Sequence, residues 1–305
     1  MPLDRRARRL LDMLAASGGT APETPAARRT ALEALAQMAD EADVDGVSSR
    51  DVVFEAGQAA IAFRIHSPDS AAGALPALIY FHGGGWVAGG LDTHAGVSAR
   101  LAAASGVRII SIDYRLAPEH PFPTGLEDCL AAARAVISDA ARFGVDAARI
   151  AVGGDSAGGG LAAAVARELG AGTVALQLLI CPILDVARTG GSRATFGEDH
   201  FISRAAFARD LADYLGSGDP GDPRVSPLKA RSFDGLPPAI IHTAEFDPFL
   251  DEGEAYARAL RSAGVDCETT RHAGMIHYFY ALARAIPYAR DAATLIGGQL
   301  RRALS

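Results

Sequence analysis

The sequence predicts an α/β fold in which a mostly parallel, eight-stranded sheet is flanked by helices. From Leu75 onward, short apolar runs rich in β-branched residues alternate with long alanine- and leucine-rich segments. Unbroken apolar runs are typical of strands buried on both faces, and helical segments between them form βαβ crossovers. The chain has 305 residues, 49% of them hydrophobic and 21% charged, which is an ordinary globular composition. Such a chain can form one large α/β domain.

Ahead of the parallel pattern, the sequence predicts two helices and two antiparallel strands. Leucines at helical spacing mark helices near residues 3–14 and 32–38, separated by the breaker-rich "GGTAPETP". Next, "DVVFE" and "AAIAFRIHSP" alternate like half-buried strands around a turn at Gly57. The later strands are predicted at "ALIYFH", "VRIISIDY", "RIAVGGD", "VALQLLICP", "PAIIHTAE" and "DCETTRH".

The alternation lapses around residues 186–230, where "RTGGSRATFGEDHF" is followed by the helix-like "SRAAFARDLADYL". Because the strand pattern resumes afterwards, we interpret this stretch as an insertion rather than as a linker between domains.

Charge and cysteine content exclude several classes of protein. The formal net charge of -7 argues against a nucleic-acid binder, and we expect the basic run Arg5, Arg6, Arg8 and Arg9 to form the solvated face of the first helix. Three widely spaced cysteines predict structural thiols in a reducing compartment, with neither a disulfide framework nor a metal site. Asp12 interrupts an apolar run that is already too short for a signal peptide, and no run is long enough to span a membrane. We therefore expect a cytoplasmic protein without stable membrane insertion.

One serine stands at a predicted strand-to-helix turn. The segment from Gly154 to Gly158 reads G-D-S-A-G and matches G-x-S-x-G, the nucleophile elbow. In such an elbow Ser156 takes a strained backbone conformation, and the two glycines avoid collisions with neighbouring elements. A glycine-rich turn that holds a phosphate is the alternative interpretation of this pattern.

A serine hydroxyl needs a base and a group that orients the base, and in elbow enzymes they follow in the order acid, then histidine. The acid candidates are Glu245, Asp247, Asp251 and Glu252. Asp247 is favoured because it lies in the loop just after a strand, whereas Asp251, the second choice, is typical of the first turn of the next helix. Two histidines come later: His272 at the end of a strand, and His277, which is favoured, in the loop beyond it.

A tetrahedral oxyanion requires preorganised donors, each worth about 3–4 kcal/mol of barrier. The segment "FHGGGWVAGG" follows an early strand, so Gly83, Gly84 and Gly85 can turn their amides toward the same point as the amide of Ala157.

Together, "HGGGWVAGG", "DYRLAPEHPFP", "GGDSAGGG", "DPFLDEG" and the histidine loop resemble the hormone-sensitive lipase-like family of α/β-hydrolases, the bacterial family IV esterases. The resemblance runs from about Leu75 to near the C-terminus. It implies the α/β-hydrolase fold, with Ser156 as nucleophile, His277 as general base and then acid, and Asp247 as its partner. It also implies an oxyanion hole made by the amides of Gly84, Gly85 and Ala157, with Gly83 as an alternative donor.

The same resemblance implies a helical cap made by residues 1–45 and the insertion at 186–230, above a catalytic domain at 46–305. It further implies that His82 holds its loop, and that Asp113, Arg115 and Glu119 form a buried polar network beneath the site. Tyr278 stands where a glycine is common in the family, so we expect a bulkier histidine loop and an altered pocket shape.

We therefore expect a carboxylic ester hydrolase for small-molecule esters of short to medium acyl chains, without cofactor or metal. The alternatives are a non-catalytic receptor of the same fold, which in plants lacks the triad histidine, and an amidase or lactonase that uses the same groups. A homodimer is possible, since "VDCETTRH" could be an edge strand that pairs. The residues expected to line an apolar pocket are Trp86, Phe201, Leu250, Met275 and Ile276.

Overall fold

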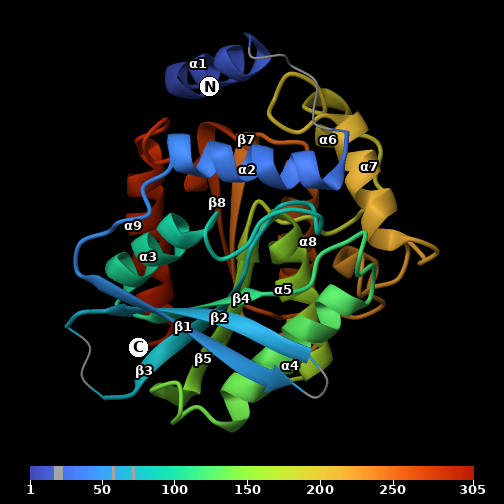
Figure 1. Ribbon diagram of the computed structural model, residues 1–305. Coiled ribbons are helices and arrows are strands. Elements are labelled where there is room, and N and C mark those ends of the chain that lie inside the picture. The colour runs from blue at the N-terminus through green and yellow to red at the C-terminus, as the bar shows by residue number, and fades with distance from the viewer. Residues whose placement is uncertain (17–22, 57–58, 71–72) are drawn as a thin grey trace.

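The computed structural model describes residues 1–16, 23–56, 59–70 and 73–305 and confirms the predicted α/β fold (Figure 1). One sheet contains eight strands. Their bounds are β1 Val47–Ala56, β2 Ala59–Pro68, β3 Leu75–Phe81, β4 Arg108–Asp113, β5 Val145–Asp155, β6 Leu176–Ile180, β7 Ala239–Phe246 and β8 Cys267–Ile276.

The sheet is mostly parallel, as predicted. The strand order is β1-β2-β4-β3-β5-β6-β7-β8, in which β2 pairs antiparallel with β1 and with β4 and all other pairs are parallel. The register places Phe81, the last residue of β3, opposite Gly154 of β5. Because the carboxyl ends of parallel strands meet at one edge, the loops after β3, β5, β7 and β8 converge there.

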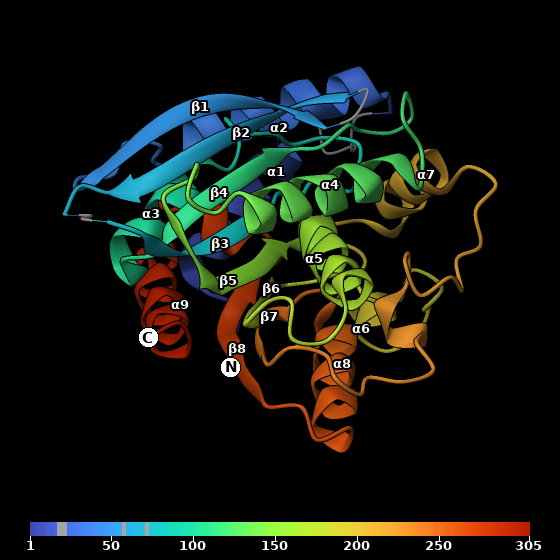
Figure 2. The same ribbon diagram turned by 90° about the horizontal axis from the view of Figure 1, so that it is seen from below.

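Helices cover both faces of the sheet. Figure 2 shows α3 and α9 on one face and α4, α5 and α8 on the other. The helices are α1 Arg5–Ala16, α2 Pro25–Ala39, α3 Ala95–Ser105, α4 Thr124–Ser138, α5 Ser156–Leu169, α6 Ser192–Thr195, α7 Arg204–Leu215, α8 Leu250–Ser262 and α9 Tyr288–Ala303, with short 3₁₀ turns η1 Pro227–Lys229 and η2 Phe279–Ala281.

The core consists of two apolar layers separated by the sheet. Leu126, Leu161 and Leu260 belong to the layer under α4, α5 and α8. Leu101 and Ile296 belong to the layer under α3 and α9. In the central strands, side chains that face the two layers, such as Leu78 and Ile79 of β3, are fully buried, which explains why these strands have unbroken apolar sequences.

Both predicted N-terminal helices are present, and Figure 1 shows α1 and α2 at the same end of the molecule as α6 and α7. Thr24 caps α2 through the N–H of Ala27, and Pro25 occupies its first position. The four arginines of α1 are exposed, as expected from the sequence. None of the helices within the described ranges is long and apolar enough to cross a membrane.

Several details differ from the sequence-based expectation or fall outside the described residues. Strand β8 continues four residues beyond His272, so His277 follows the strand end directly. The turn expected at Gly57 lies outside the described residues, as does most of the breaker-rich segment after α1. All three cysteines are free thiols.

Candidate active site

Ser156 occupies a strained turn between β5 and α5. Its φ of 53° lies in the left-handed region, as predicted for a nucleophile elbow. A Cβ atom at Gly154 would lie 2.3 Å from the carbonyl oxygen of Phe81, and one at Gly158 only 2.0 Å from the same oxygen. The two glycines therefore let β3 and the first turn of α5 approach each other closely enough to form the turn.

His277 joins the serine to a carboxylate. Its Nε2 lies 2.9 Å from Ser156 Oγ, and its Nδ1 lies 2.8 Å from Asp247 Oδ2. All three side chains are buried, and Phe249 packs edge-on against the imidazole ring. This is the chain of hydrogen bonds through which a serine hydroxyl transfers its proton to a base.

Asp247 is fixed by the turn between β7 and α8. Its Oδ1 accepts a 2.8 Å hydrogen bond from the N–H of Phe249, which leaves Oδ2 directed at His277. Asp251, the second choice, accepts instead from the N–H of Ser192 at the start of α6. Glu252 accepts from two backbone amides after β6, and Glu245 accepts from the N–H of Gly274.

His272 lies away from the serine, inside the core between β7 and α9. Its Nε2 is 2.9 Å from His242 Nδ1, and its Nδ1 is 3.0 Å from the hydroxyl of Tyr288. Burial lowers the pKa of His272 to about 4 and that of His242 to about 3, so both rings are neutral at pH 7.

The glycine loop after β3 lies beside the serine. Gly84 and Gly85 have φ values of 121° and 66° and line the same cavity as Ser156. The N–H of Gly83 is instead held by Asp155 Oδ1 at 3.0 Å, so this amide is not available to an oxyanion. The N–H of Ala157 belongs to the first turn of α5, where helix amides have no acceptor within the helix.

His82 lies under this loop. Its Nδ1 is 2.8 Å from the carbonyl oxygen of Gly83, and its ring stacks on Tyr114 with 4.3 Å between centroids. Burial lowers the pKa of His82 to about 4, which leaves the ring neutral. These contacts agree with the loop-holding position that the family resemblance implies.

Asp155 was not singled out from the sequence, yet it is the centre of the buried polar network. Besides Gly83, it accepts hydrogen bonds from Tyr80 and Tyr280 at 2.7 and 2.8 Å, and His94 Nε2 lies 3.3 Å away. Burial acts to raise the pKa of Asp155, but His94 and the hydroxyl donors outweigh it and lower the pKa to about 2. In the sequence, its position directly before Ser156 in the G-D-S-A-G motif could have pointed to this residue.

The network expected from Asp113, Arg115 and Glu119 does not form, because all three residues are exposed. Arg115 pairs with Asp128 at 2.6 Å, and Glu119 pairs with Arg29 of α2 at 2.6 Å. Charged side chains at the surface keep their hydration, so these three residues of the "DYRLAPEHPFP" segment stay at the surface, and the buried polar network forms around Asp155 instead.

A family model described as alpha/beta hydrolase fold matches residues 78–281, more than half of the chain. The chain belongs to the α/β-hydrolase family.

Relatives within this family confirm the resemblance to hormone-sensitive lipase-like esterases. The chain is 42% identical to the carboxylic ester hydrolase LipN of Mycobacterium tuberculosis, over 71% of this chain and 60% of LipN. It is 37% identical to carboxylesterase NlhH of the same species, over 85% of this chain and 83% of NlhH. Among solved structures, the ester-hydrolase EH1AB1 from the metagenome of Lake Arreo superposes with a TM-score of 0.94 at 40% identity, covering 98% of both chains.

A cavity of about 860 Å³ opens over Ser156 and His277 of this α/β-hydrolase. Its walls come from α1 and α2, from residues 183–210 and from the glycine loop. Of the five predicted pocket residues, Phe201 lines the cavity. The other four, Trp86, Leu250, Met275 and Ile276, are buried in the core, and Trp86 stacks on Tyr214 of α7 with 4.4 Å between ring centroids.

Tyr278 also lines the cavity, directly after His277. Its φ of 66° is a conformation that glycine adopts freely, and the phenol ring stacks on Phe201 with 5.6 Å between centroids. Phe201 itself has a φ of 81°. Two aromatic residues in strained backbone conformations thus form one wall of the cavity.

Cys181, Asp247 and His277 are the described residues whose ligand atoms lie within 4.8 Å of one another and could hold a metal ion. Binding a metal there would break the hydrogen bond between His277 and Asp247. Burial raises the pKa of the Cys181 thiol well above its usual range, so the thiolate that metals prefer is disfavoured. The donor set therefore suits proton transfer better than metal binding.

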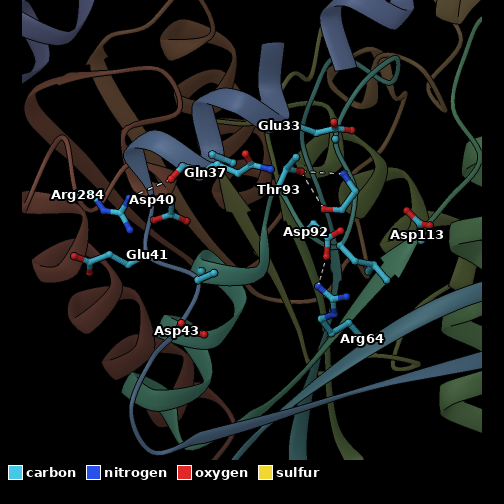
Figure 3. A pocket seen from close by; sticks show the side chains of 16 residues that line it. Glu33, Gln37, Asp40, Glu41, Asp43, Arg64, Asp92, Thr93, Asp113 and Arg284 are labelled. Atoms are coloured by element: carbon cyan, nitrogen blue, oxygen red, sulfur yellow. Dashed lines mark hydrogen bonds and ion pairs between the residues drawn. The ribbon is translucent and has the colours of Figure 1, made fainter. Parts of the chain in front are cut away.

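A second cavity, of about 670 Å³, lies between the end of α2 and the loop that precedes α3 (Figure 3). Acidic side chains dominate its lining, and three of them are held by arginines: Asp92 pairs with Arg64, Asp40 with Arg100, and Glu41 with Arg290. Asp113 also lines it. Ser156 and His277 do not reach this cavity, so the candidate site is the one above the elbow.

Proposed function

We propose that this protein is a carboxylic ester hydrolase that acts through an acyl-Ser156 intermediate. The observation that carries the proposal is the unbroken series of hydrogen bonds from Asp247 through His277 to Ser156, which ends at a cavity that Gly84 and Gly85 also line. Similarity to carboxylesterases and ester hydrolases supports the same reaction.

In the proposed mechanism, His277 Nε2 takes the proton of Ser156 Oγ as the oxygen attacks the ester carbonyl carbon. The amides of Gly84, Gly85 and Ala157 stabilise the negative oxygen of the tetrahedral intermediate. The C–O bond to the alcohol then breaks, and His277 returns the proton to the leaving alkoxide. Water attacks the acyl-serine in the same way, and the carboxylic acid leaves with Ser156 regenerated.

Asp247 orients the ring of His277 and stabilises the imidazolium that forms after each proton transfer. Because the base is a protein side chain, the reaction as proposed needs no metal ion or cofactor. A chelator such as EDTA should therefore leave the rate unchanged.

We further propose that α1, α2 and residues 186–230 form a cap over the catalytic domain. These segments supply most of the cavity wall, including Leu11, Leu35 and Phe207. A cavity of this size, with many apolar side chains in its wall, favours short to medium acyl chains over long ones. The cytoplasmic location and the homodimer remain predictions; β8 does lie at an edge of the sheet, where a second copy could pair.

The test is hydrolysis of p-nitrophenyl esters from acetate to palmitate by the wild-type protein and by Ser156→Ala. We expect the highest kcat/KM for short chains, and a fall in kcat on the order of a million-fold in Ser156→Ala. Ser138→Ala, in α4, serves as the matched control and should retain full activity. Substantial activity in Ser156→Ala would overturn the mechanism.

A folded wild-type protein that hydrolyses none of these esters would favour the receptor alternative instead. The presence of His277, which the receptor class lacks, argues against that outcome.

A further inference from the structure

Arg28 and Asp210 form an ion pair inside the cavity that contains Ser156. Arg28 Nη2 of α2 lies 2.5 Å from Asp210 Oδ2 of α7, and the side chains are only 18% and 9% exposed. Both residues line the cavity. The pair therefore places two opposite charges among the leucine, alanine and phenylalanine side chains of the wall, which also contains the charged residues Arg8, Asp12, Glu198 and Asp199.

The carboxylate of Asp210 lies against the glycine loop beside the serine. A Cβ atom built on Gly85 would be 2.5 Å from Asp210 Oδ2 and 3.1 Å from its Cγ. Gly85 also lines the cavity next to Ser156, so a substrate whose carbonyl oxygen approaches this loop would extend past Asp210.

Helix α7 holds Asp210 at a fixed position. Ser203 caps the helix through the N–H of Ala206, and four residues after Asp210 the ring of Tyr214 stacks on Trp86. The carbonyl of Tyr214 also accepts a 2.7 Å hydrogen bond from the N–H of Phe122. A polar group on so firmly held an element can discriminate between substrates, because it does not move away from a poor match.

Burying this pair costs free energy that a substrate could partly recover. Taking charges out of water is unfavourable even when they are paired. Burial raises the pKa of Asp210 to about 7 although Arg28 acts to lower it, which indicates that the carboxylate is poorly hydrated. A hydrogen-bond donor supplied by a substrate would replace part of the lost hydration.

We propose, on the basis of the proposed ester hydrolysis, that Asp210 and Arg28 are specificity-determining residues that bind a hydroxyl group on the substrate. An ionised Asp210 paired with Arg28 has no net charge, so a cationic substrate group would meet the guanidinium as well as the carboxylate. A neutral hydroxyl can donate to Asp210 and accept from Arg28. The substrate class is thus hydroxylated esters in preference to plain alkyl esters of the same size.

The test uses two ester pairs in which a hydroxyl replaces a methyl group of nearly the same volume. Ethyl 3-hydroxybutyrate against ethyl 3-methylbutyrate places the hydroxyl on the acyl side, and 2-hydroxyethyl butyrate against propyl butyrate places it on the alcohol side. The kcat/KM ratio within each pair is measured for the wild type, for Asp210→Leu and for Arg28→Met/Asp210→Leu. Comparing these ratios cancels the intrinsic reactivity of each ester.

We expect the hydroxyl-to-methyl ratio of at least one pair to fall about tenfold in both variants, which corresponds to about 1.4 kcal/mol. The pair that responds identifies the side of the ester that faces Asp210. Asp51→Asn, which alters the ion pair with Arg64 in β2 outside the cavity, is the control and should leave both ratios unchanged.

The double variant guards against misfolding, because it removes both members of the ion pair and leaves neither Arg28 nor Asp210 without its partner, and a thermal melt verifies each protein. Ratios that stay within twofold of the wild type for both pairs, in folded variants that hydrolyse p-nitrophenyl esters, would overturn this inference alone. A wild-type protein that hydrolyses no ester would overturn the proposed function and this inference together.

Discussion

Tyr80 of β3 and Tyr280 of η2 donate hydrogen bonds to opposite oxygens of the same carboxylate, that of Asp155. The carboxylate thereby connects the strand before the glycine loop with the 3₁₀ turn that follows His277. Since Asp155 also holds the N–H of Gly83 and is directly bonded to Ser156 in the chain, one buried side chain connects the three segments that form the site.

Asp155→Asn should therefore weaken both the fold and the reaction. The amide would present two N–H groups where the carboxylate accepts, so at least one buried donor would lose its acceptor. We expect a loss of about 3 kcal/mol in the free energy of unfolding. Urea denaturation measures it, and Tyr280→Phe, which removes a single bond, should cost about half as much. Equal stability of Asp155→Asn and wild type would contradict this account.

Asp247→Asn should lower kcat by about 10⁴-fold with little change in KM, because the amide favours the wrong tautomer of His277. Asp251→Asn is the matched control on the same loop and helix. It loses contacts to the start of α6, so we expect a modest loss of stability and less than about a tenfold change in kcat. Steady-state kinetics with p-nitrophenyl butyrate distinguish the two residues, and similar losses in both would argue against Asp247.

Gly158→Ala should destabilise the protein by about 3 kcal/mol or more, because the new Cβ would overlap the carbonyl oxygens of Phe81 and His82 at 2.0 and 2.4 Å. Both are backbone atoms that cannot rotate away. Gly298→Ala in α9 is the contrasting change, since its nearest atom, at 3.8 Å, is the end of the Arg302 side chain. Helix propensity predicts a gain of up to about 1 kcal/mol there. Thermal melts of the two variants should shift in opposite directions.

Buried histidines should make the fold sensitive to mild acid. In the folded state the pKa values of His242 and His272 are about 3 and 4, against about 6.5 in an unfolded chain. Between pH 6.5 and 4 the unfolded chain binds protons that the folded protein does not, so the free energy of unfolding falls as the pH falls. Their contribution is fully present above pH 6.5, and each neutral ring adds up to about 1.4 kcal/mol per pH unit to the slope.

His242→Asn keeps a polar atom toward His272 but removes one titrating group. The slope of the free energy of unfolding against pH is measured by urea denaturation from pH 7 to 5. It should become less steep by the amount that corresponds to about one proton fewer bound on unfolding. An unchanged slope in His242→Asn would show that the pair does not contribute to acid sensitivity.

Phe201→Ala should shift the preferred acyl or alcohol chain toward longer esters. The ring forms one wall of the cavity with Tyr278, and its loss removes apolar volume from that wall. We expect the kcat/KM optimum to move by two or more carbons, and each added methylene to contribute up to about 0.8 kcal/mol of binding. Leu250→Ala, in the core but outside the cavity wall, should reduce stability and leave the optimum in place.

The sequence was sufficient for the features that depend on local pattern and chain order. Strand and helix types follow from apolar runs and alanine-rich segments, and Ser156, Asp247 and His277 follow from an elbow motif and the order of acid and histidine. The features it did not reveal join distant segments: Asp155 with Tyr280, and Arg28 with Asp210. No spacing connects such partners, because they meet through the packing of one layer on another.

The same reason explains the pocket residues. Trp86 stands next to the glycine loop in the sequence, but its ring turns toward α7 and stacks on Tyr214. Met275 and Ile276 precede His277 on β8, where they face core rather than cavity. Neighbourhood in sequence therefore indicated the loops that the structure brings together around Ser156, but not the direction in which individual side chains point.

The residues in the walls of the cavity and the residues of the Ser156–His277–Asp247 series come from different parts of the chain. Ser156, Asp247 and His277 stand at strand ends of the sheet, whereas Leu35, Arg28 and Asp210 belong to helices outside it. In the proposed mechanism, a change in α2 or α7 can thus alter what enters the cavity without changing the atoms that transfer the proton. Substrate choice and catalytic rate can consequently be engineered separately, by mutating the wall helices in a library while the strand ends are held constant.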